Sequence, residues 1–176
     1  VFLYAHSGGG RRPAFFRRGG PVELARRLAA GELWPDLGPG RLDPRKGAAL
    51  VGARPPLVAY NVDLATDDVE VADTVARTVR ESGGGMRGVQ AIGLQLPQAG
   101  RIQVSMNIVD LANAPLHEVV ARVAREARAR GVSISGGELV GMVPRHVLEA
   151  AARAGVVVPG LDESRVLERA LEQTSL

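Results

Sequence analysis

Apolar and polar residues alternate along three short stretches beyond the first third of the chain, and this period of two predicts β-strands. The stretch 57–64 places its larger apolar side chains on one face and Asn61 with Asp63 on the other. The stretches 89–96 and 101–110 alternate in the same way, and the Pro-Gln-Ala-Gly sequence between them is typical of a hairpin turn. We therefore expect three strands here, of which the last two form a hairpin.

Between and after these strands, apolar residues recur with the helical period. This pattern predicts helices at 67–81, 115–130, 144–154 and 163–173, and a fourth strand at 132–140. The central order of strand, helix, strand, strand, helix and strand is the ferredoxin-like βαββαβ arrangement, an α/β fold of the α+β class. It implies a four-stranded sheet in the order 4-1-3-2, with the first two helices on one face.

The face of this sheet that carries no helix is expected to be polar at its centre. The strand at 101–110 turns Ser105 and Asn107 away from its apolar side. Gln103 and Asn61 fall on the same face. Such a face is either solvated surface or the wall of a ligand site, and the alternation alone favours solvated surface.

The first 54 residues follow a less regular pattern. We expect a strand at 1–4 and a helix from Pro21 to the residue before Gly31, whereas 31–47 is too rich in Pro and Gly for regular structure. The strand starts abruptly and has no evident partner in this part of the chain. We therefore expect an incomplete piece of a second α/β lobe, with its remainder upstream.

The composition of the chain limits the classes of protein to which it can belong. A chain of 176 residues with 45% hydrophobic and 23% charged residues can form one soluble core, or one domain and part of another. It has no run of about 18 apolar residues, so we expect no membrane-spanning helix and no membrane partner. It contains no cysteine, which excludes disulfides and thiol catalysis. No signal peptide pattern opens the sequence, and we expect a cytoplasmic protein.

Positive charge is concentrated in the first third of the chain. Residues 1–54 carry ten Lys and Arg against four Asp and Glu, whereas residues 55–176 carry 12 against 15. A basic segment can bind nucleic acid or an anionic small molecule. Aromatic residues make up only 3% of the chain, which leaves little material for base stacking. We therefore expect no nucleic-acid partner.

Two features with familiar spacing do not support their usual chemistry. Residues 83–88 fit G-x-G-x-x-G, but a dinucleotide site needs a strand before this motif and a helix after it. Here the predicted order is the reverse, so a loop between helix and strand is expected. The histidines His6, His117 and His146 stand in separate segments without metal-ligand spacing, and we expect no metal.

The segment 38–47 combines three glycines with three cations. Glycines let backbone N–H groups approach a ligand, and Arg and Lys pair with carboxylates, so the segment suits carboxylates or a pteridine-glutamate tail. A linker between domains is the alternative, and composition alone favours the linker. The residues of this segment are Gly38, Pro39, Gly40, Arg41, Leu42, Asp43, Pro44, Arg45, Lys46 and Gly47.

Six strings of residues form a pattern that covers nearly the whole chain. They are Val1-Phe2-Leu3-Tyr4, Trp34-Pro35-Asp36-Leu37-Gly38-Pro39, Gly47-Ala48, Val51-Gly52-Ala53-Arg54-Pro55-Pro56-Leu57-Val58-Ala59-Tyr60-Asn61-Val62, Gln103-Val104-Ser105-Met106-Asn107 and Gly137-Glu138-Leu139-Val140-Gly141-Met142-Val143-Pro144. In these strings and in their order, the chain resembles the glutamate formiminotransferase family, which includes the formiminotransferase domain of formiminotransferase-cyclodeaminase.

The resemblance implies two α/β lobes whose sheets face each other across a tunnel that binds folate. Residues 1–51 would be the end of the N-terminal lobe with the crossing segment, and residues 52–176 would be the C-terminal lobe. The segment 38–47 matches the folate-binding segment of the family, which reverses the preference for a linker. The resemblance also makes Arg54 a nearby cation, and it turns three residues of the helix-free face into tunnel wall. These are Asn61, Ser105 and Asn107.

The family transfers a formimino group from N-formiminoglutamate to N5 of tetrahydrofolate, a step of histidine degradation and one-carbon metabolism. The resemblance therefore implies both molecules as partners, tetrahydrofolate as co-substrate, and a homodimer. The family assigns proton transfer to a His in a His-Pro-Arg context of the N-terminal lobe. No His-Pro-Arg occurs here, and His6 lies where the family usually shows Gly-Glu. We therefore expect no catalytic residue in this chain.

Two hypotheses remain open from the sequence. The chain is either part of a folate-dependent formiminotransferase or a ferredoxin-like folate-binding or regulatory module that has lost catalysis. An upstream reading frame that encodes His-Pro-Arg would support the transferase. A start codon near Val1 would support the module.

Overall fold

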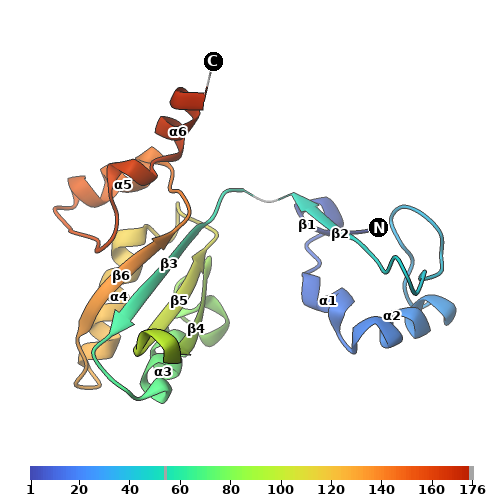
Figure 1. Ribbon diagram of the computed structural model, residues 1–176, viewed down its shortest axis with the longest axis horizontal. Coiled ribbons are helices and arrows are strands. Elements are labelled where there is room, and N and C mark those ends of the chain that lie inside the picture. The colour runs from blue at the N-terminus through green and yellow to red at the C-terminus, as the bar shows by residue number, and fades with distance from the viewer. Residues whose placement is uncertain (54, 175–176) are drawn as a thin grey trace. The chain divides into compact units, whose positions relative to one another are not determined.

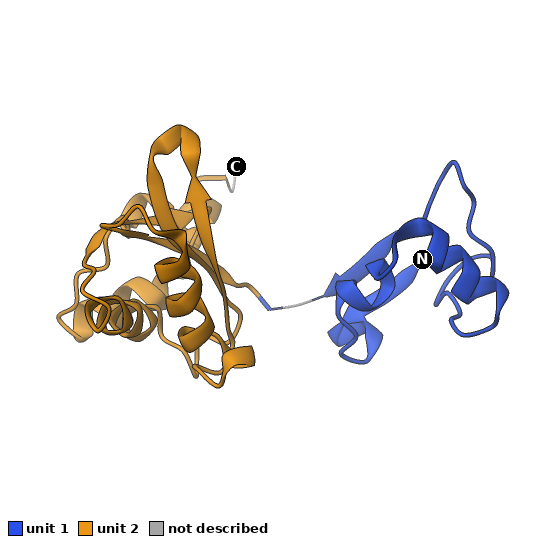
Figure 2. Cartoon of the chain, turned by 90° about the horizontal axis from the view of Figure 1, so that it is seen from below, with its two compact units in different colours: residues 1–55 blue, residues 56–176 orange. Residues whose placement is uncertain are grey.

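The computed structural model describes residues 1–53 and 55–174 and forms two compact units. Unit 1 comprises residues 1–55 and unit 2 comprises residues 56–176, shown in blue and orange in Figure 2. Each unit has a hydrophobic core of its own and is described by itself. The boundary expected from the sequence lies between residues 51 and 52, and the assignment of the two parts to lobes stays a prediction.

Unit 2 is built on a four-stranded antiparallel sheet. Its strands are β3 (Val58–Leu64), β4 (Val89–Leu96), β5 (Arg101–Ile108) and β6 (Ile134–Val140). They lie side by side in the order β4-β5-β3-β6, as Figure 1 shows. The first and third strands of the unit are therefore central, and the expected ferredoxin-like order is confirmed.

Two helices cover one face of this sheet. α3 (Val69–Val79) packs against β4 and β5, and α4 (Leu116–Arg128) packs against β3 and α3. Their apolar stripes meet the apolar faces of the strands in a single core, in which Tyr60 of β3 is the largest fully buried side chain. The other face of the sheet is left without a helix from this pair, as the alternation predicts.

The chain ends with two further helices, α5 (Arg145–Arg153) and α6 (Leu167–Thr174), which stand at the end of the sheet where β6 finishes (Figure 1). A short 3₁₀ turn at Glu163–Arg165 precedes α6. Val147 of α5 is buried in the core of the unit. Within the described residues, no helix combines the length and the apolar character needed to cross a membrane.

The G-x-G-x-x-G motif forms the connection between α3 and β4. The three glycines that define the motif all lie where a Cβ atom would collide: Gly83 against the carbonyl of Arg77, Gly85 against that of Val79, and Gly88 against Asp110. Gly88 also has a φ of 76°, which favours glycine. The glycines are therefore required by a tight turn, and no phosphate-binding role is needed to explain them.

Unit 1 contains two short strands and two helices. β1 (Phe2–Ala5) pairs in parallel with β2 (Leu50–Ala53), and α1 (Pro13–Arg17) and α2 (Gly20–Ala29) lie between them in the chain. The expected strand at the N-terminus thus has a partner within this unit, whereas the expectation that the remainder of this lobe lies upstream stays a prediction. β2 escaped notice because four residues that include Gly and Ala carry no clear strand signal.

A small aromatic and aliphatic cluster holds unit 1 together. Phe2 of β1 packs against Phe16 of α1, with ring centroids 5.1 Å apart. Leu24 and Leu28 of α2 complete the cluster with Leu33. Beyond α2, residues 31–47 contain turns and one isolated bridge but no helix or strand, as their Pro and Gly content predicts.

Candidate functional site

The helix-free face of unit 2 is organised in rows of residues that pair directly across the strands. Side chains of directly paired residues in antiparallel strands share a face, so the register identifies each row. Written from β6 through β3 and β5 to β4, three rows are Val140, Ala59, Asn107 and Gln90; Glu138, Asn61, Ser105 and Ile92; and Gly136, Asp63, Gln103 and Leu94. We name them the Ala59 row, the Asn61 row and the Asp63 row.

The two rows that contain the predicted site residues carry polar groups without protein partners. Asn61 and Ser105 are directly paired and half-buried, and Asn107 is exposed in the neighbouring row. The structure therefore brings these three predicted residues together. Among the described residues, no side-chain hydrogen bond is formed by Asn61, Ser105 or Asn107, and Glu138 beside them has no ion pair. Their donors and acceptors are available to a ligand.

Exposed apolar side chains flank this polar centre. Ile92 on β4 is 52% exposed and lies at one end of the Asn61 row. Val140 on β6 is 50% exposed and lies at one end of the Ala59 row. Small-molecule sites typically combine apolar walls with a few placed polar groups. A planar heterocycle with polar edges fits such a surface.

The Asp63 row differs because its polar groups bind each other. Gln103 donates from Nε2 to Oδ1 of Asp63 at 2.6 Å, and Arg101 donates from Nη1 to Oδ2 at 3.1 Å. Gln103 is only 2% exposed and Asp63 8%. Sequence reasoning placed both residues on this face but did not select them, because alternation reports the face of a residue and not its partners.

Burial and the carboxylate of Asp63 both affect the pKa of Tyr60, the next residue but two on β3. Burial raises the pKa of Tyr60 above its ordinary value, and the negative charge of Asp63 adds to this shift. Both effects disfavour the ionised phenol. Tyr60 is therefore a neutral hydrogen-bond donor in the folded state.

The segment 38–47 lies in unit 1 and is exposed except for Leu42, which packs against the core of that unit. Oδ1 of Asp43 accepts hydrogen bonds from the backbone N–H groups of Arg45 at 2.8 Å and Lys46 at 3.1 Å. The backbone N–H of Gly47 donates to the carbonyl oxygen of Asp43 at 2.8 Å. These three backbone N–H groups are therefore used within the segment, and the role of the segment as a folate site stays a prediction.

The cationic side chains of the segment 38–47 differ from its backbone N–H groups, because no described residue pairs with them. The side chains of Arg41, Arg45 and Lys46 are exposed and form no ion pair with another described residue. Gly38, with a φ of 91°, permits the turn that precedes them. Arg54, the fourth predicted cation, lies outside the described residues.

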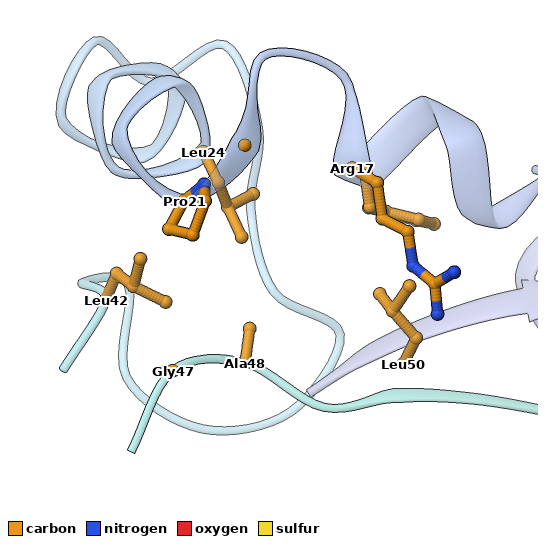
Figure 3. A pocket seen from close by; sticks show the side chains of 9 residues that line it. Arg17, Pro21, Leu24, Leu42, Gly47, Ala48 and Leu50 are labelled. Carbon is orange, nitrogen blue, oxygen red and sulfur yellow. The ribbon is translucent and has the colours of Figure 1, made fainter. Parts of the chain in front are cut away.

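A cavity of about 440 Å³ opens in unit 1 beside this segment. Figure 3 shows that Leu42, Gly47 and Ala48 line one side and Pro21 and Leu24 of α2 line the other. The lining is almost wholly apolar. The cavity therefore offers little to fix a polar ligand, apart from the guanidinium of one arginine, Arg17.

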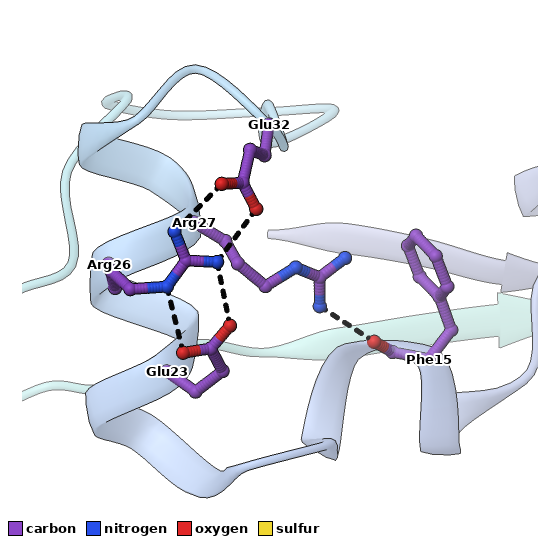
Figure 4. A network of polar contacts seen from close by, with 5 residues as sticks. All are labelled: Phe15, Glu23, Arg26, Arg27 and Glu32. Atoms are coloured by element: carbon purple, nitrogen blue, oxygen red, sulfur yellow. Dashed lines mark hydrogen bonds and ion pairs between the residues drawn. The ribbon is translucent and has the colours of Figure 1, made fainter.

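Several cations of the basic first third serve the structure of unit 1. Arg26 on α2 lies between Glu23 and Glu32 and donates two hydrogen bonds to each, at 2.7–2.9 Å (Figure 4). These bonds hold the pKa of both carboxyl groups below their ordinary values. Arg27 is 4% exposed and donates to the carbonyl oxygen of Phe15 at 2.8 Å. The positive charge of this segment is thus partly neutralised internally.

The three histidines lie in three different segments of the chain. His6 lies in unit 1, His117 near the start of α4 and His146 near the start of α5. In the part of the chain that the structure describes, no three His, Cys, Asp or Glu side chains come together in a way that could hold a metal.

Comparison with known protein families shows to which family this chain belongs. Residues 59–157, more than half of the chain, match the family described as the formiminotransferase domain. The chain belongs to the formiminotransferase family. All three rows of the helix-free face lie inside the matched formiminotransferase segment, whereas the segment 38–47 lies before it.

Curated relatives extend the similarity beyond the matched domain. The chain is 35% identical to the glutamate formimidoyltransferase of Streptococcus pyogenes, over 97% of this chain and 58% of the relative. It is 31% identical to that of Thermoplasma acidophilum, over 99% of this chain and 59% of the relative. It is 36% identical to the formimidoyltransferase-cyclodeaminase of Gallus gallus, over 86% of this chain and 30% of the relative. The chain thus spans less than two thirds of the length of these relatives.

Proposed function

We propose that this chain is part of a folate-dependent glutamate formiminotransferase. On this proposal, residues 52–176 form its C-terminal lobe, and residues 1–51 form the end of its N-terminal lobe with the crossing segment. Membership of the family and the names of the bacterial and archaeal relatives support it. The polypeptide that carries this chain together with the N-terminal lobe is called the full-length protein below.

The observation that carries this proposal is the set of unpaired polar side chains on the helix-free face. The pterin ring of tetrahydrofolate is a planar heterocycle whose edge presents amide and amine groups. Asn61 and Asn107 each donate and accept hydrogen bonds, as that edge requires. Ile92 and Val140 supply the apolar surface beside them. Both the hydrogen-bonding groups and the apolar side chains of the face therefore suit a pterin.

The proposed reaction moves a formimino group from N-formiminoglutamate to N5 of tetrahydrofolate. N5 attacks the formimino carbon, the resulting tetrahedral intermediate loses glutamate, and protons pass from N5 to the leaving nitrogen. The protein must hold the two reactants together and assist the proton transfer. On this proposal, the helix-free face holds the folate, and the N-terminal lobe supplies the acid-base group, because the chain has no His-Pro-Arg.

The segment 38–47 is proposed to meet the glutamate tail of the folate. Three exposed cations that form no ion pair with a described residue suit its carboxylates, because an Arg guanidinium pairs with a carboxylate through two parallel hydrogen bonds. The internal hydrogen bonds of Asp43 support the same role, since they fix the turn that presents Arg45 and Lys46. Asp43 itself is therefore a turn residue on this proposal.

The activity assay for this proposal uses two proteins. The full-length protein is expected to release glutamate from N-formiminoglutamate only when tetrahydrofolate is present. The 176-residue chain alone is expected not to, because it lacks the acid-base group. Absence of release by the full-length protein would contradict the proposal. Release by the chain alone would show that one of its own residues, such as His6 or His146, can transfer the proton.

A second candidate function is a folate-binding or regulatory module without catalysis. The ferredoxin-like sheet with its polar helix-free face would suit such a module as well. The DNA upstream of Val1 separates the two candidates, since a reading frame that encodes His-Pro-Arg supports the transferase. A homodimer and a cytoplasmic location also stay predictions, and sedimentation of the purified full-length protein tests the dimer.

A further inference from the structure

Asp63 and Gln103 are two of only three buried polar or charged residues within the described part of the chain, the third being Arg27 in unit 1. They lie opposite each other on β3 and β5, at the helix-free face. A buried polar pair is costly, and an apolar pair of similar size at such a place is often as stable or more stable. Stability alone therefore does not explain why this face holds them.

The hydrogen bonds of Asp63 fix the orientation of the Gln103 amide. A carboxylate that accepts hydrogen bonds must face the NH₂ group of an amide, and Nε2 of Gln103 lies 2.6 Å from Oδ1. Oδ2 is occupied by Arg101 at 3.1 Å. On the side of β6, a Cβ atom at Gly136 would lie only 3.0 Å from Oδ2, so this glycine leaves the carboxylate its place.

This orientation leaves one group of the pair without a protein partner. The carbonyl oxygen of Gln103, Oε1, lies on the side of the amide away from the NH₂ group that Asp63 holds. Among the described residues, no donor forms a hydrogen bond with Oε1. The neighbouring Asn61 row, with Ser105 paired to Asn61, is the part of the face proposed to hold the pterin. An acceptor held in one orientation thus lies in the row next to the one proposed to hold the pterin.

We propose that Oε1 of Gln103 accepts a hydrogen bond from the N5–H of tetrahydrofolate, and that Asp63 is the positioning residue that holds the amide for it. This inference rests on the proposed function. A hydrogen-bond acceptor in a fixed position contributes most to the rate where it orients the atom that attacks. In this reaction the attacking atom is N5. The hydrogen bond turns N5–H toward the sheet and its lone pair toward the formimino carbon.

Gln103 does not take the proton in this arrangement. An amide oxygen is a very weak base, so the N5–H bond stays intact until the acid-base group of the N-terminal lobe acts. No bond is made or broken at Gln103 or Asp63. Their contribution is the geometry of attack, which distinguishes them from residues that transfer protons.

The test compares tetrahydrofolate with 5-deazatetrahydrofolate, in which a CH₂ group of nearly the same size replaces N5–H. The dissociation constants of both are measured for the full-length protein. The wild type is expected to prefer tetrahydrofolate about tenfold, because the deaza compound offers no donor to Oε1 of Gln103 and displaces the water that would otherwise bind it. A preference below twofold in the wild type would overturn the inference without any variant.

Three variants separate positioning from a merely structural role. In Asp63→Asn, the new amide can donate as well as accept, so Gln103 is no longer held in one orientation and the preference is expected to fall to about two- to threefold. In Gln103→Met, which keeps the volume, the preference is expected to vanish while 5-deazatetrahydrofolate binds as before. In the control Arg101→Met, the Gln103 bond remains and the preference is expected to persist.

The outcomes distinguish this inference from the function on which it rests. If both folates bind and the preference is unchanged in Asp63→Asn and in Gln103→Met, the inference is wrong and the proposed function stands. If the wild type binds neither folate, the proposed function fails and the inference fails with it. Should Asp63→Asn fail to fold, the wild type and Gln103→Met still decide the role of Oε1.

Discussion

The hydroxyl group of Tyr60 on β3 donates a hydrogen bond to the carbonyl oxygen of Pro159, 99 residues further along the chain. The bond joins the centre of the sheet to the segment between α5 and α6. Gly137 makes room for it, because a Cβ atom there would collide with the Tyr60 hydroxyl. The buried phenol of Tyr60 thus adds a hydrogen bond to the apolar packing, for example of Val147 and Val158, that holds the C-terminal segment of unit 2 in the core.

Removal of this hydroxyl is expected to destabilise unit 2. Tyr60→Phe loses one buried hydrogen bond and leaves the Pro159 carbonyl without a donor, at a cost of about 1–2 kcal/mol in the free energy of unfolding. Urea unfolding followed by circular dichroism measures it, since the single tryptophan, Trp34, lies in unit 1. Tyr4→Phe in unit 1 is the matched control. Equal stability of the Tyr60→Phe variant and the wild type would show that the bond contributes nothing.

The raised pKa of Tyr60 predicts a loss of stability in alkali. Burial, and secondarily the charge of Asp63, raises this pKa in the folded state above the unfolded value of about 10. The contribution of Tyr60 is therefore fully present below about pH 10 and falls by up to about 1.4 kcal/mol per pH unit above it. Unfolding measured from pH 8 to 11.5 tests this. Tyr60→Phe should flatten the curve, and an unchanged slope would contradict the prediction.

Gly137 is expected to tolerate no side chain. Its Cβ would meet the Tyr60 hydroxyl and the ring carbon that carries it. Gly137→Ala should therefore displace Tyr60 or the Pro159 segment, at a cost of about 1–3 kcal/mol. Ser135→Ala, at an exposed position of the same strand, should change stability by less than about 0.5 kcal/mol. Comparable effects of the two substitutions in thermal unfolding would refute the crowding argument.

The fold of unit 2 could be predicted because each element carries a strong local signal. The strands alternate over seven or eight residues, and the two helices on the sheet, α3 and α4, bury complete apolar stripes, as α4 does with Leu116, Val119 and Val123. Unit 1 was harder because its elements are short. α1 has five residues and β2 has four, too few for a period to show. Their structure depends on packing around Phe2 and Phe16, which a local pattern does not reveal.

The site could be predicted only as far as faces and local turns allow. Alternation placed Asn61, Ser105 and Asn107 on one face, and the register confirms that they are neighbours. Alternation could not show that Gln103 is buried against Asp63, because this contact depends on the pairing of two strands that are far apart in the sequence. The turn at Asp43 did carry a signal, since Asp often accepts hydrogen bonds from the backbone two residues later.

The exposed cations of the segment 38–47 predict selectivity for folates with long glutamate tails. In the full-length protein, Arg41→Ala or Arg45→Ala should weaken binding of polyglutamyl tetrahydrofolate more than binding of the monoglutamate. Because both side chains are exposed, each loss should stay below about 1 kcal/mol, or roughly fivefold. Higher salt should reduce the difference. Arg153→Ala on α5, which pairs with Glu149, is the control cation and should leave both affinities unchanged.

Asn107 is expected to behave differently from these cations, because it belongs to the face proposed to hold the pterin rather than the tail. Asn107→Ala in the full-length protein should weaken the monoglutamate and the polyglutamate alike. The loss of a neutral hydrogen bond of about 0.5–1.5 kcal/mol corresponds to roughly two- to twelvefold in each dissociation constant. Calorimetric titration with both folates measures the two ratios. Affinities that stay the same in Asn107→Ala, Arg41→Ala and Arg45→Ala would mean that the polar face is solvated surface and the segment 38–47 is a linker.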